Sequence, residues 1–304
     1  MMQIFSTCPR SSHVARSRYL EYVADVARWT ERAGWAGTLV SSDNSLVDPW
    51  ILSHVIVRNS EALRPLVAVQ PAYMHPYCVA KQITSFAYLY GRRLSLDLHA
   101  GAPDNDLDAL GDTAPHDRRV ARLIEYTEIV MRLLETGGPL TIDGAFYKTL
   151  NLKLTPPLPT SLRPEVIVSG TPKVEAGIGR PAVRIGIIAR DRADHAWTIA
   201  RSRFPEDRVH HVENGDSPLW MAPFHRYRTL CPYLVGTYDT IAREIGRYLS
   251  LGYETFILDV PSDPEELEHI NVAFGHSMNS RQSAVSDGLT PSLQLPTVQA
   301  SAQA

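Results

Sequence analysis

The stretch VIVSGTPKVEAGIGRPAVRIGIIAR, from Val166 to Arg190, decides which fold this chain can adopt. It contains two β-like runs, VIVSG and VRIGIIAR, separated by residues 171–182 alone. Elsewhere the chain follows each β-like run with a complete helical segment. A crossover between parallel strands needs about a dozen residues or more by itself. Residues 171–182 therefore cannot hold a helix, a further strand and two loops, and one strand–helix unit is missing.

Strand and helix signals alternate along the rest of the chain. Continuous apolar runs predict buried strands at Gln3–Ser6, Gly37–Ser41, Leu66–Gln70, Leu94–His99, Val166–Val168, Val183–Ala189 and Thr255–Leu258. Apolar residues at helical spacing predict helices at Ser17–Ala33, Pro49–Val57, Pro76–Tyr90, Arg118–Leu134, Asp191–Arg203 and Thr237–Leu251. Strands without polar alternation indicate a parallel sheet that is covered by helices on its outer face.

This alternation predicts an α/β protein with a TIM-like (β/α)8 barrel that is incomplete around strand six. No G-x-G-x-x-G follows the first strand, which disfavours a Rossmann fold. Either the barrel closes with seven strands, or residues 171–182 supply an irregular substitute. An unpaired strand edge must be covered by a loop or a partner subunit, so we expect a homodimer. The barrel domain is expected at 1–278, and the Ser-, Gln-, Pro- and Ala-rich tail at 279–304 to be disordered.

Composition excludes several classes of partner. The net charge of −3 and a pI near 6.4 argue against nucleic acid and anionic membranes. The three cysteines form no C-x-x-C pair, no apolar run reaches membrane-spanning length, and the first residues do not resemble a signal peptide. We therefore expect a cytoplasmic protein. The predicted strand ends carry no spaced His/Asp/Glu trio, so no metal site is predicted.

Two segments are candidate anion sites. Ser169-Gly170-Thr171 follows a strand, and small residues let backbone N–H groups approach a phosphate; an ordinary turn is the alternative. His116–Arg119 precedes an amphipathic helix, and there the alternative is a solvated helix start. His99 ends a strand, where it is either catalytic or bonded within the barrel. Ligands of such barrels bind at the carboxyl ends of the strands, where all three segments are expected.

Several motifs in fixed order resemble one enzyme family. They are QPAYMHPYCVAKQ (70–82), HDRRVARLIEYTEIVMRLL (116–134), IDGAFYKTLNLKL (142–154) and VIVSG (166–170). Over roughly Gln3–Met278 the chain resembles the bacterial luciferase-like flavin-dependent monooxygenases, most closely a shortened variant of their alkanesulfonate-monooxygenase-like branch.

The resemblance implies an FMNH2- and O2-dependent monooxygenase with a separate NAD(P)H:flavin reductase. Its substrate would be a small organic or carrier-protein-bound molecule, in the setting of natural-product biosynthesis. Two alternatives stay open: a flavin-binding barrel without oxygenase activity, and a deazaflavin-dependent oxidoreductase. In the monooxygenases of this family the flavin supplies the difficult chemistry, and the protein positions it.

The resemblance also assigns residues. FMN would be held by Asp97, His116, Arg119, Ser169, Gly170 and Thr171, and the catalytic candidates are His99, Arg184 and Tyr227. Asp97 stands where the family usually has asparagine, and a carboxylate near a reduced flavin must be paired or protonated. Val120 replaces a tyrosine that approaches the flavin phosphate, and Gly186 replaces an active-site histidine. Because these and other sulfonate-specific residues differ, sulfonate is not predicted as substrate.

Overall fold

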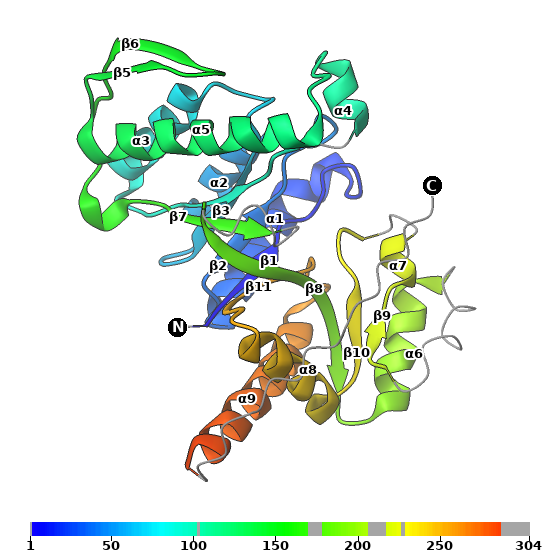
Figure 1. The fold of residues 1–304 in the computed structure, drawn as a ribbon. Helices are drawn as coiled ribbons and strands as arrows, with labels where there is room; N and C mark the ends of the chain where they lie inside the picture. Colours follow the sequence, from blue (N-terminus) through cyan, green and yellow to red (C-terminus); the bar gives the residue numbers. More distant parts are fainter. Residues whose placement is uncertain (1, 102–103, 170–177, 206–216, 226–228, 287–304) are drawn as a thin grey trace.

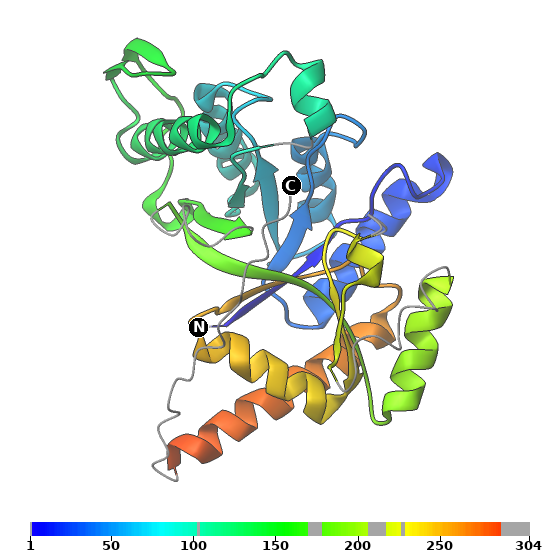
Figure 2. The same ribbon diagram turned by 45° about the vertical axis from the view of Figure 1, so that its right-hand side comes forward.

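The computed structural model describes residues 2–101, 104–169, 178–205, 217–225 and 229–286. Within these residues seven parallel strands form a closed barrel that helices surround (Figures 1 and 2). The barrel strands are β1 (Gln3–Thr7), β2 (Gly37–Val40), β3 (Arg64–Val69), β4 (Ser95–Leu98), β7 (Glu165–Ser169), β8 (Arg180–Arg190) and β11 (Thr255–Leu258). The helices are α1 (Arg16–Arg32), α2 (Pro49–Arg58), α3 (Pro76–Tyr90), α4 (Asp104–Ala109), α5 (His116–Thr136), α6 (Ala193–Arg203), α7 (Ala222–His225), α8 (Tyr238–Ser250) and α9 (Pro264–Ser286). The predicted TIM-like α/β barrel is confirmed.

Strand β8 closes the barrel where the sequence lacks a unit. It pairs first with β7, where Ser169 lies opposite Ala182, and then with β11. The two strands beside the missing unit thus pair with each other. The alternative of a barrel that closes with seven strands is confirmed, and the expectation of exposed edges at these two strands was wrong. The physical reason is length, because β8 begins at Arg180 rather than at the predicted Val183, and this extension reaches β7.

The end of β8 leaves the barrel. Residues 186–190 pair with β10 (Tyr233–Thr237), which in turn pairs antiparallel with β9 (Leu219–Trp220). The change of partner occurs at Gly186, where a Cβ atom would lie 2.5 Å from the Tyr233 ring. Only glycine therefore lets this ring lie against the strand.

Apolar side chains fill the inside of the barrel. Side chains alternate between the two faces of a strand, and the interior set is Phe5, Leu39, Leu66, Ala68, Ile167, Ala182 and Ile257. Strand β4 differs, because its inward positions are the fully buried polar residues Ser95 and Asp97. The barrel is thus a packed core, and β4 contributes two polar groups to it instead of apolar ones.

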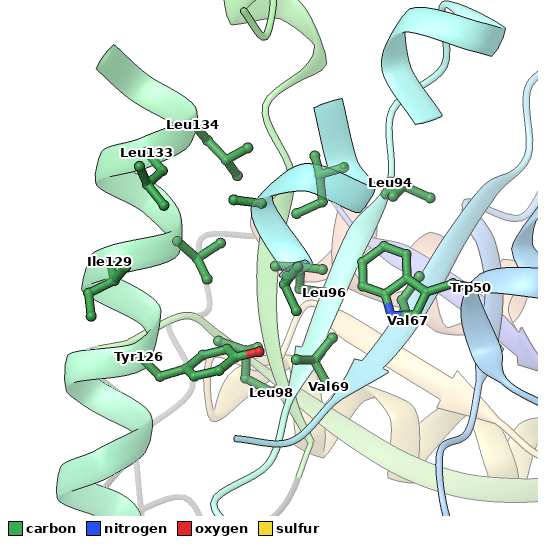
Figure 3. Packing of buried hydrophobic residues seen from close by; sticks show 14 of the residues in the cluster. Trp50, Val67, Val69, Leu94, Leu96, Leu98, Tyr126, Ile129, Leu133 and Leu134 are labelled. Atoms are coloured by element: carbon green, nitrogen blue, oxygen red, sulfur yellow. The ribbon is translucent and has the colours of Figure 1, made fainter. Parts of the chain in front are cut away.

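The outer face of β3 and β4 packs against helices α3 and α5. Leu96 and Leu98 of β4 meet Tyr126, Ile129 and Leu133 of α5 in the largest apolar cluster (Figure 3). These α5 residues recur at helical spacing, so one face of a long amphipathic helix is buried. The cluster fixes α5 against the sheet, and with it the position of the first turn of α5.

A charged network closes the amino-terminal end of the barrel. Glu165 accepts hydrogen bonds from Gln3 at 3.1 Å and from Arg64 at 3.2 Å, and the Arg180 Nε lies 3.0 Å from its other oxygen. Burial raises the pKa of Glu165, but the Gln3 and Arg64 hydrogen bonds and the Arg180 charge bring it below its ordinary value. The charges at this end are matched internally.

Some elements were not predicted from the sequence. They include the hairpin of β5 (Leu140–Asp143) with β6 (Lys148–Leu152), strands β9 and β10, and helices α4, α7 and α9. Helix α9 runs to Ser286, past the predicted domain boundary at 278, and residues 287–304 lie outside the described residues. None of the described helices combines the length and the apolar character that crossing a bilayer requires.

Candidate active site

Polar side chains gather at the carboxyl-terminal end of the barrel, called the mouth below. Each lies two residues beyond an interior apolar residue, so it points to the same inner face. They are Thr7 after Phe5, Ser41 after Leu39, Gln70 after Ala68, Ser169 after Ile167, Arg184 after Ala182, and Asp259 after Ile257. Because all strands of the barrel are parallel, these groups share one end of the molecule.

Asp97 is the centre of the best-connected cluster at the mouth. Its carboxylate is fully buried and accepts hydrogen bonds from the Ser169 amide at 3.1 Å and the Ser169 hydroxyl at 2.8 Å. The His99 Nε2 lies 2.9 Å from the same carboxylate oxygen. Asp97 is thus paired, which is the condition that a carboxylate near a reduced flavin must meet. A carboxylate beside Nε2 also favours a proton on that nitrogen.

Ser169 does not have the geometry expected of a phosphate ligand. Both its amide and its hydroxyl donate to Asp97. Gly170 and Thr171, the rest of the predicted cradle, lie outside the described residues, as does Tyr227. The observed role of Ser169 is to hold the Asp97 carboxylate.

A pocket of about 220 Å³ lies beside the ends of β2 and β3. Gln70 lines it and donates through Nε2 to the Ser42 carbonyl at 3.1 Å. Its Oε1 is buried and accepts no hydrogen bond from the described residues. A buried carbonyl oxygen without a donor is costly, so this oxygen suits a ligand N–H group.

The loops around this pocket are fastened by Asp106 of α4. Its carboxylate accepts hydrogen bonds from the Asn44 backbone N–H at 3.0 Å and from the Tyr73 hydroxyl at 2.5 Å. Burial, and then the hydrogen bond to Asp106, raise the pKa of Tyr73, so the hydroxyl keeps its proton. The buried Asp106 therefore joins the loops after β2 and β3.

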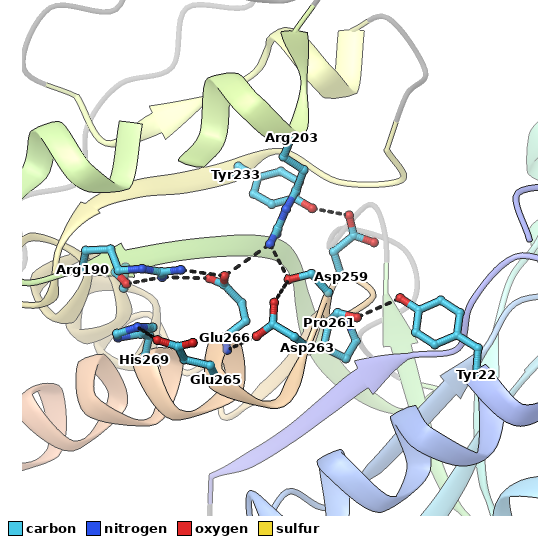
Figure 4. A network of polar contacts seen from close by, with 12 residues as sticks. Tyr22, Arg190, Arg203, Tyr233, Asp259, Pro261, Asp263, Glu265, Glu266 and His269 are labelled. Carbon is cyan, nitrogen blue, oxygen red and sulfur yellow. Dashed lines mark hydrogen bonds and ion pairs between the residues drawn. The ribbon is translucent and has the colours of Figure 1, made fainter. Parts of the chain in front are cut away.

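A second and larger pocket, about 310 Å³, lies at the ends of β1 and β11. Asp259 accepts a 2.5 Å hydrogen bond there from Tyr233, and Tyr22 donates to the Pro261 carbonyl at 3.0 Å (Figure 4). Burial, and then the Asp259 charge, raise the pKa of Tyr233 well above its ordinary value. Tyr233 therefore remains a hydrogen-bond donor to Asp259.

An ion network supports the wall of this pocket (Figure 4). Arg190 at the end of β8 forms a two-pronged pair with Glu266 of α9, with contacts of 3.2 and 2.9 Å. Arg203 at the end of α6 reaches the same carboxylate at 3.3 Å and the Ser262 hydroxyl at 2.7 Å. The network ties β8, α6 and α9 together behind the pocket.

The first turn of α5 offers donors to an anion. His116 is exposed at the start of the helix, whose preceding residue Pro115 provides no side-chain cap. Arg119 packs against Gly101 and donates to the Ala114 carbonyl at 3.2 Å, but its Nε is buried and has no hydrogen-bond partner among the described residues. A helix amino terminus and an unpaired guanidinium N–H both favour negative charge.

The remaining predicted positions have plainer surroundings. Arg184 lies at the mouth, with its Nη2 3.5 Å from the Ser41 hydroxyl. Val120 is 4% exposed and belongs to the apolar cluster between α5 and the sheet, so it is a core residue. Sequence reasoning missed Tyr233 and Arg203, because nothing in their local pattern shows that β10 and α6 reach the mouth.

These features are those of a TIM-barrel enzyme, whose ligands bind at the carboxyl ends of the strands. The sequence model of the luciferase-like monooxygenases matches residues 1–206, more than half of the chain, and the chain belongs to that family. Membership confirms the predicted family and enzyme class, a flavin-dependent monooxygenase.

The chain is also similar to individual members of known activity. The 4-(gamma-L-glutamylamino)butanoyl-[BtrI acyl-carrier protein] monooxygenase BtrO of Niallia circulans is 28% identical over an alignment 325 positions long, gaps included, which covers 89% of this chain and 95% of BtrO. The alignment spans nearly the whole of both proteins.

Solved structures agree in fold. EDTA monooxygenase (EmoA) from Chelativorans sp. BNC1 matches with a TM-score of 0.67 and 15% identity over 95% of each chain. An F420-dependent secondary alcohol dehydrogenase matches at 0.66 and 14%, over 91% of this chain and 99% of its own. The oxygenating constituent of 3,6-diketocamphane monooxygenase from Pseudomonas putida, in complex with FMN, matches at 0.61 and 15%, over 89% and 96%.

Proposed function

We propose that the protein is a two-component monooxygenase that receives FMNH2 from a separate NAD(P)H:flavin reductase and oxidises an acyl substrate carried on a carrier protein. The observation that carries the proposal is the paired Asp97 at the mouth, in a chain that aligns with 95% of a carrier-protein monooxygenase. Pairing removes the objection to a carboxylate beside a reduced flavin.

The mouth offers groups that fit FMN. The unpaired Arg119 Nε and the uncapped first turn of α5 would take the phosphate, together with His116. The unpaired Gln70 Oε1 would accept a hydrogen bond from a ring N–H. When reduced and bound, the flavin supplies the electrons for oxygen activation.

The protein's own groups hold the reacting region in place. Asp97 orients the His99 ring, and the Ser169 amide and hydroxyl donate hydrogen bonds to the same carboxylate. His99 is 24% exposed, so its ring reaches the mouth. We assign His99 the transfer of a proton at the substrate, and Arg184 the stabilisation of negative charge there. Tyr227 remains a third catalytic candidate.

Product analysis tests the reaction. The full chain is mixed anaerobically with photoreduced FMN and a panel of carrier-protein-bound acyl thioesters, and 18O2 is then admitted. The proposal expects one 18O atom in a thioester product, which mass spectrometry of the carrier protein detects. Reoxidation of the flavin without a labelled product identifies a flavin-binding barrel without oxygenase activity. Turnover with reduced F420 alone identifies the deazaflavin alternative.

Ligand binding tests the cofactor site separately. Arg119→Gln should weaken FMN binding at least tenfold and leave riboflavin binding unchanged, because only FMN carries the phosphate. Arg118→Gln is the matched control, since Arg118 is exposed and its guanidinium lies 5.4 Å from the Phe146 ring centroid. Equal losses for FMN and riboflavin would remove Arg119 from the phosphate site.

We also propose a cytoplasmic homodimer. Helices α2 and α3 contact each other through His54 and Tyr90, and they expose Ile51, Tyr88 and Leu89 to 61%, 77% and 64%. Large exposed apolar side chains on adjacent helices favour self-association. Sedimentation of Tyr88→Glu, compared with the wild type, tests the assignment, and an unchanged dimer would place the interface elsewhere.

A further inference from the structure

The larger pocket at the mouth combines charges of both signs with apolar walls. Arg10, His13, Arg203 and Asp259 line it. Apolar wall residues are Pro9, Val14, Phe204, Leu230 and Val260. A pocket of about 310 Å³ with this lining suits a ligand that has a charged head and an apolar body.

Arg10 is the cation with unused hydrogen-bonding capacity. Its Nη2 lies 3.5 Å from the Asp43 carboxylate, at the limit of a hydrogen bond. Its Nε is buried and finds no partner among the described residues. An unpaired buried donor costs free energy, and the planar guanidinium matches a carboxylate with two parallel hydrogen bonds. A ligand carboxylate would satisfy Arg10 better than Asp43 does.

Arg203 is different, because it is already engaged. Its Nη2 donates to the Ser262 hydroxyl at 2.7 Å and contacts the Glu266 carboxylate at 3.3 Å (Figure 4). Its guanidinium is held by the network behind the pocket. Arg203 therefore forms wall, and the carboxylate anchor is Arg10.

Asp259 supplies the opposite charge. One carboxylate oxygen accepts from Tyr233 at 2.5 Å and the other from the Val260 amide at 2.8 Å. A carboxylate has about four acceptor positions, so Asp259 retains capacity on a side chain that lines the pocket. The group that matches this capacity and charge is an ammonium.

We propose that this pocket binds an α-amino acid group at the far end of the substrate, with the carboxylate on Arg10 and the ammonium on Asp259. The inference rests on the proposed function, because it names the substrates of that monooxygenase as acyl chains that end in an amino acid. The apolar walls hold the chain between this end and the reacting carbon.

Unreactive probes test the pocket without any oxidation. L-2-aminooctanoate has the amino acid head and an apolar chain, L-2-aminooctanamide lacks the carboxylate, and N-acetyl-L-2-aminooctanoate lacks the ammonium. Calorimetry on the full chain, with and without oxidised FMN, should show the first probe binding at least tenfold more tightly than either of the others. Equal affinity for all three would overturn the proposal.

Variants assign the two ends. Arg10→Gln should lower the affinity for L-2-aminooctanoate at least tenfold and leave that for the amide unchanged, and Asp259→Asn should remove the discrimination against the acetylated probe. Arg18→Gln, at an exposed position on α1, is the control. Asp43→Asn tests the same assignment even if the Arg10 variant does not fold. It should tighten binding of L-2-aminooctanoate, because the Asp43 carboxylate no longer competes with the ligand carboxylate for Arg10. Equal weakening of acid and amide by Arg10→Gln would overturn the assignment.

The two proposals fail separately. Probe discrimination without an 18O-labelled product would overturn the monooxygenase and leave the pocket assignment standing. A labelled product from simple acyl thioesters, together with equal affinity for all three probes, would support the monooxygenase and overturn the pocket assignment.

Discussion

The two ends of the barrel use charge in opposite ways. At the amino-terminal end, Glu165 is matched by Gln3, Arg64 and Arg180. At the mouth, Arg10 and Arg119 each retain a buried N–H group without a partner among the described residues. The charged groups around Glu165 hydrogen-bond to one another and stabilise the fold, whereas the two N–H groups at the mouth can still donate to a ligand. Stability and binding should therefore respond to mutations at different ends.

The largest effect on stability is expected at Glu165. Glu165→Ala leaves two arginines without their shared carboxylate, and breaking a buried ion pair costs up to about 5 kcal/mol. Since these arginines are partly exposed, we expect a loss of about 3 kcal/mol in the free energy of unfolding, measured by urea denaturation, with unchanged FMN affinity. Glu128→Ala breaks an exposed pair with Arg132 and should cost no more than about 0.5 kcal/mol. A loss of FMN affinity in Glu165→Ala would show that the ends are coupled.

Asp97→Ala should separate stability from binding at the mouth. It leaves the Ser169 donors and His99 without their acceptor, a cost of about 2 kcal/mol. Because these groups orient the mouth, FMN affinity should fall at least tenfold, unlike in Glu165→Ala. Equilibrium unfolding and FMN titration of both variants make the comparison, and full FMN affinity in Asp97→Ala would argue against the assigned site.

Gly186→Ala tests the rim of the mouth, where β8 leaves the barrel. The added methyl group would meet the Tyr233 ring, and such overpacking costs about 1.5 kcal/mol. Gly275→Ala in helix α9 has open space around it and should be neutral or stabilising by up to about 1 kcal/mol. Thermal unfolding of both variants is the measurement. A stabilised Gly186→Ala would mean that Tyr233 moves freely.

The smallest effect is a difference in pH dependence. The folded-state pKa of Glu165 lies below its ordinary value, so its contribution is present above the unfolded pKa and is lost as pH falls through the folded pKa. The wild type should therefore lose more unfolding free energy on acidification below about pH 5 than Glu165→Ala does. Parallel pH profiles of the two proteins would remove Glu165 from the acid response.

Much of this architecture could be predicted from local sequence signals. Apolar runs such as those of β2 and β3 identify buried strands because both faces are covered. The absence of one strand–helix unit follows from the length of residues 171–182, which are too few to hold it. What could not be predicted depends on distant partners: Glu165 meets Gln3 across most of the barrel sequence, and Tyr233 reaches Asp259 only because β10 pairs with the end of β8. The same applies to Ser169, whose hydroxyl could not be assigned to Asp97 rather than to a phosphate before the two strands were brought together.

Because β8 closes the barrel with seven strands, the number of strands is odd, and this affects how the interior residues are layered. In an eight-stranded barrel the interior residues form layers of four, contributed by alternate strands. An odd ring cannot be divided in that way, so at least one pair of neighbouring strands must contribute to the same layer. A barrel with fewer strands also has a smaller diameter. At Gly37 the neighbouring groups are close, since a Cβ atom added there would lie 2.0 Å from the Arg64 carbonyl and 2.7 Å from the Phe5 ring. Because apolar side chains pack against one another inside the barrel, ligands are expected at its rim.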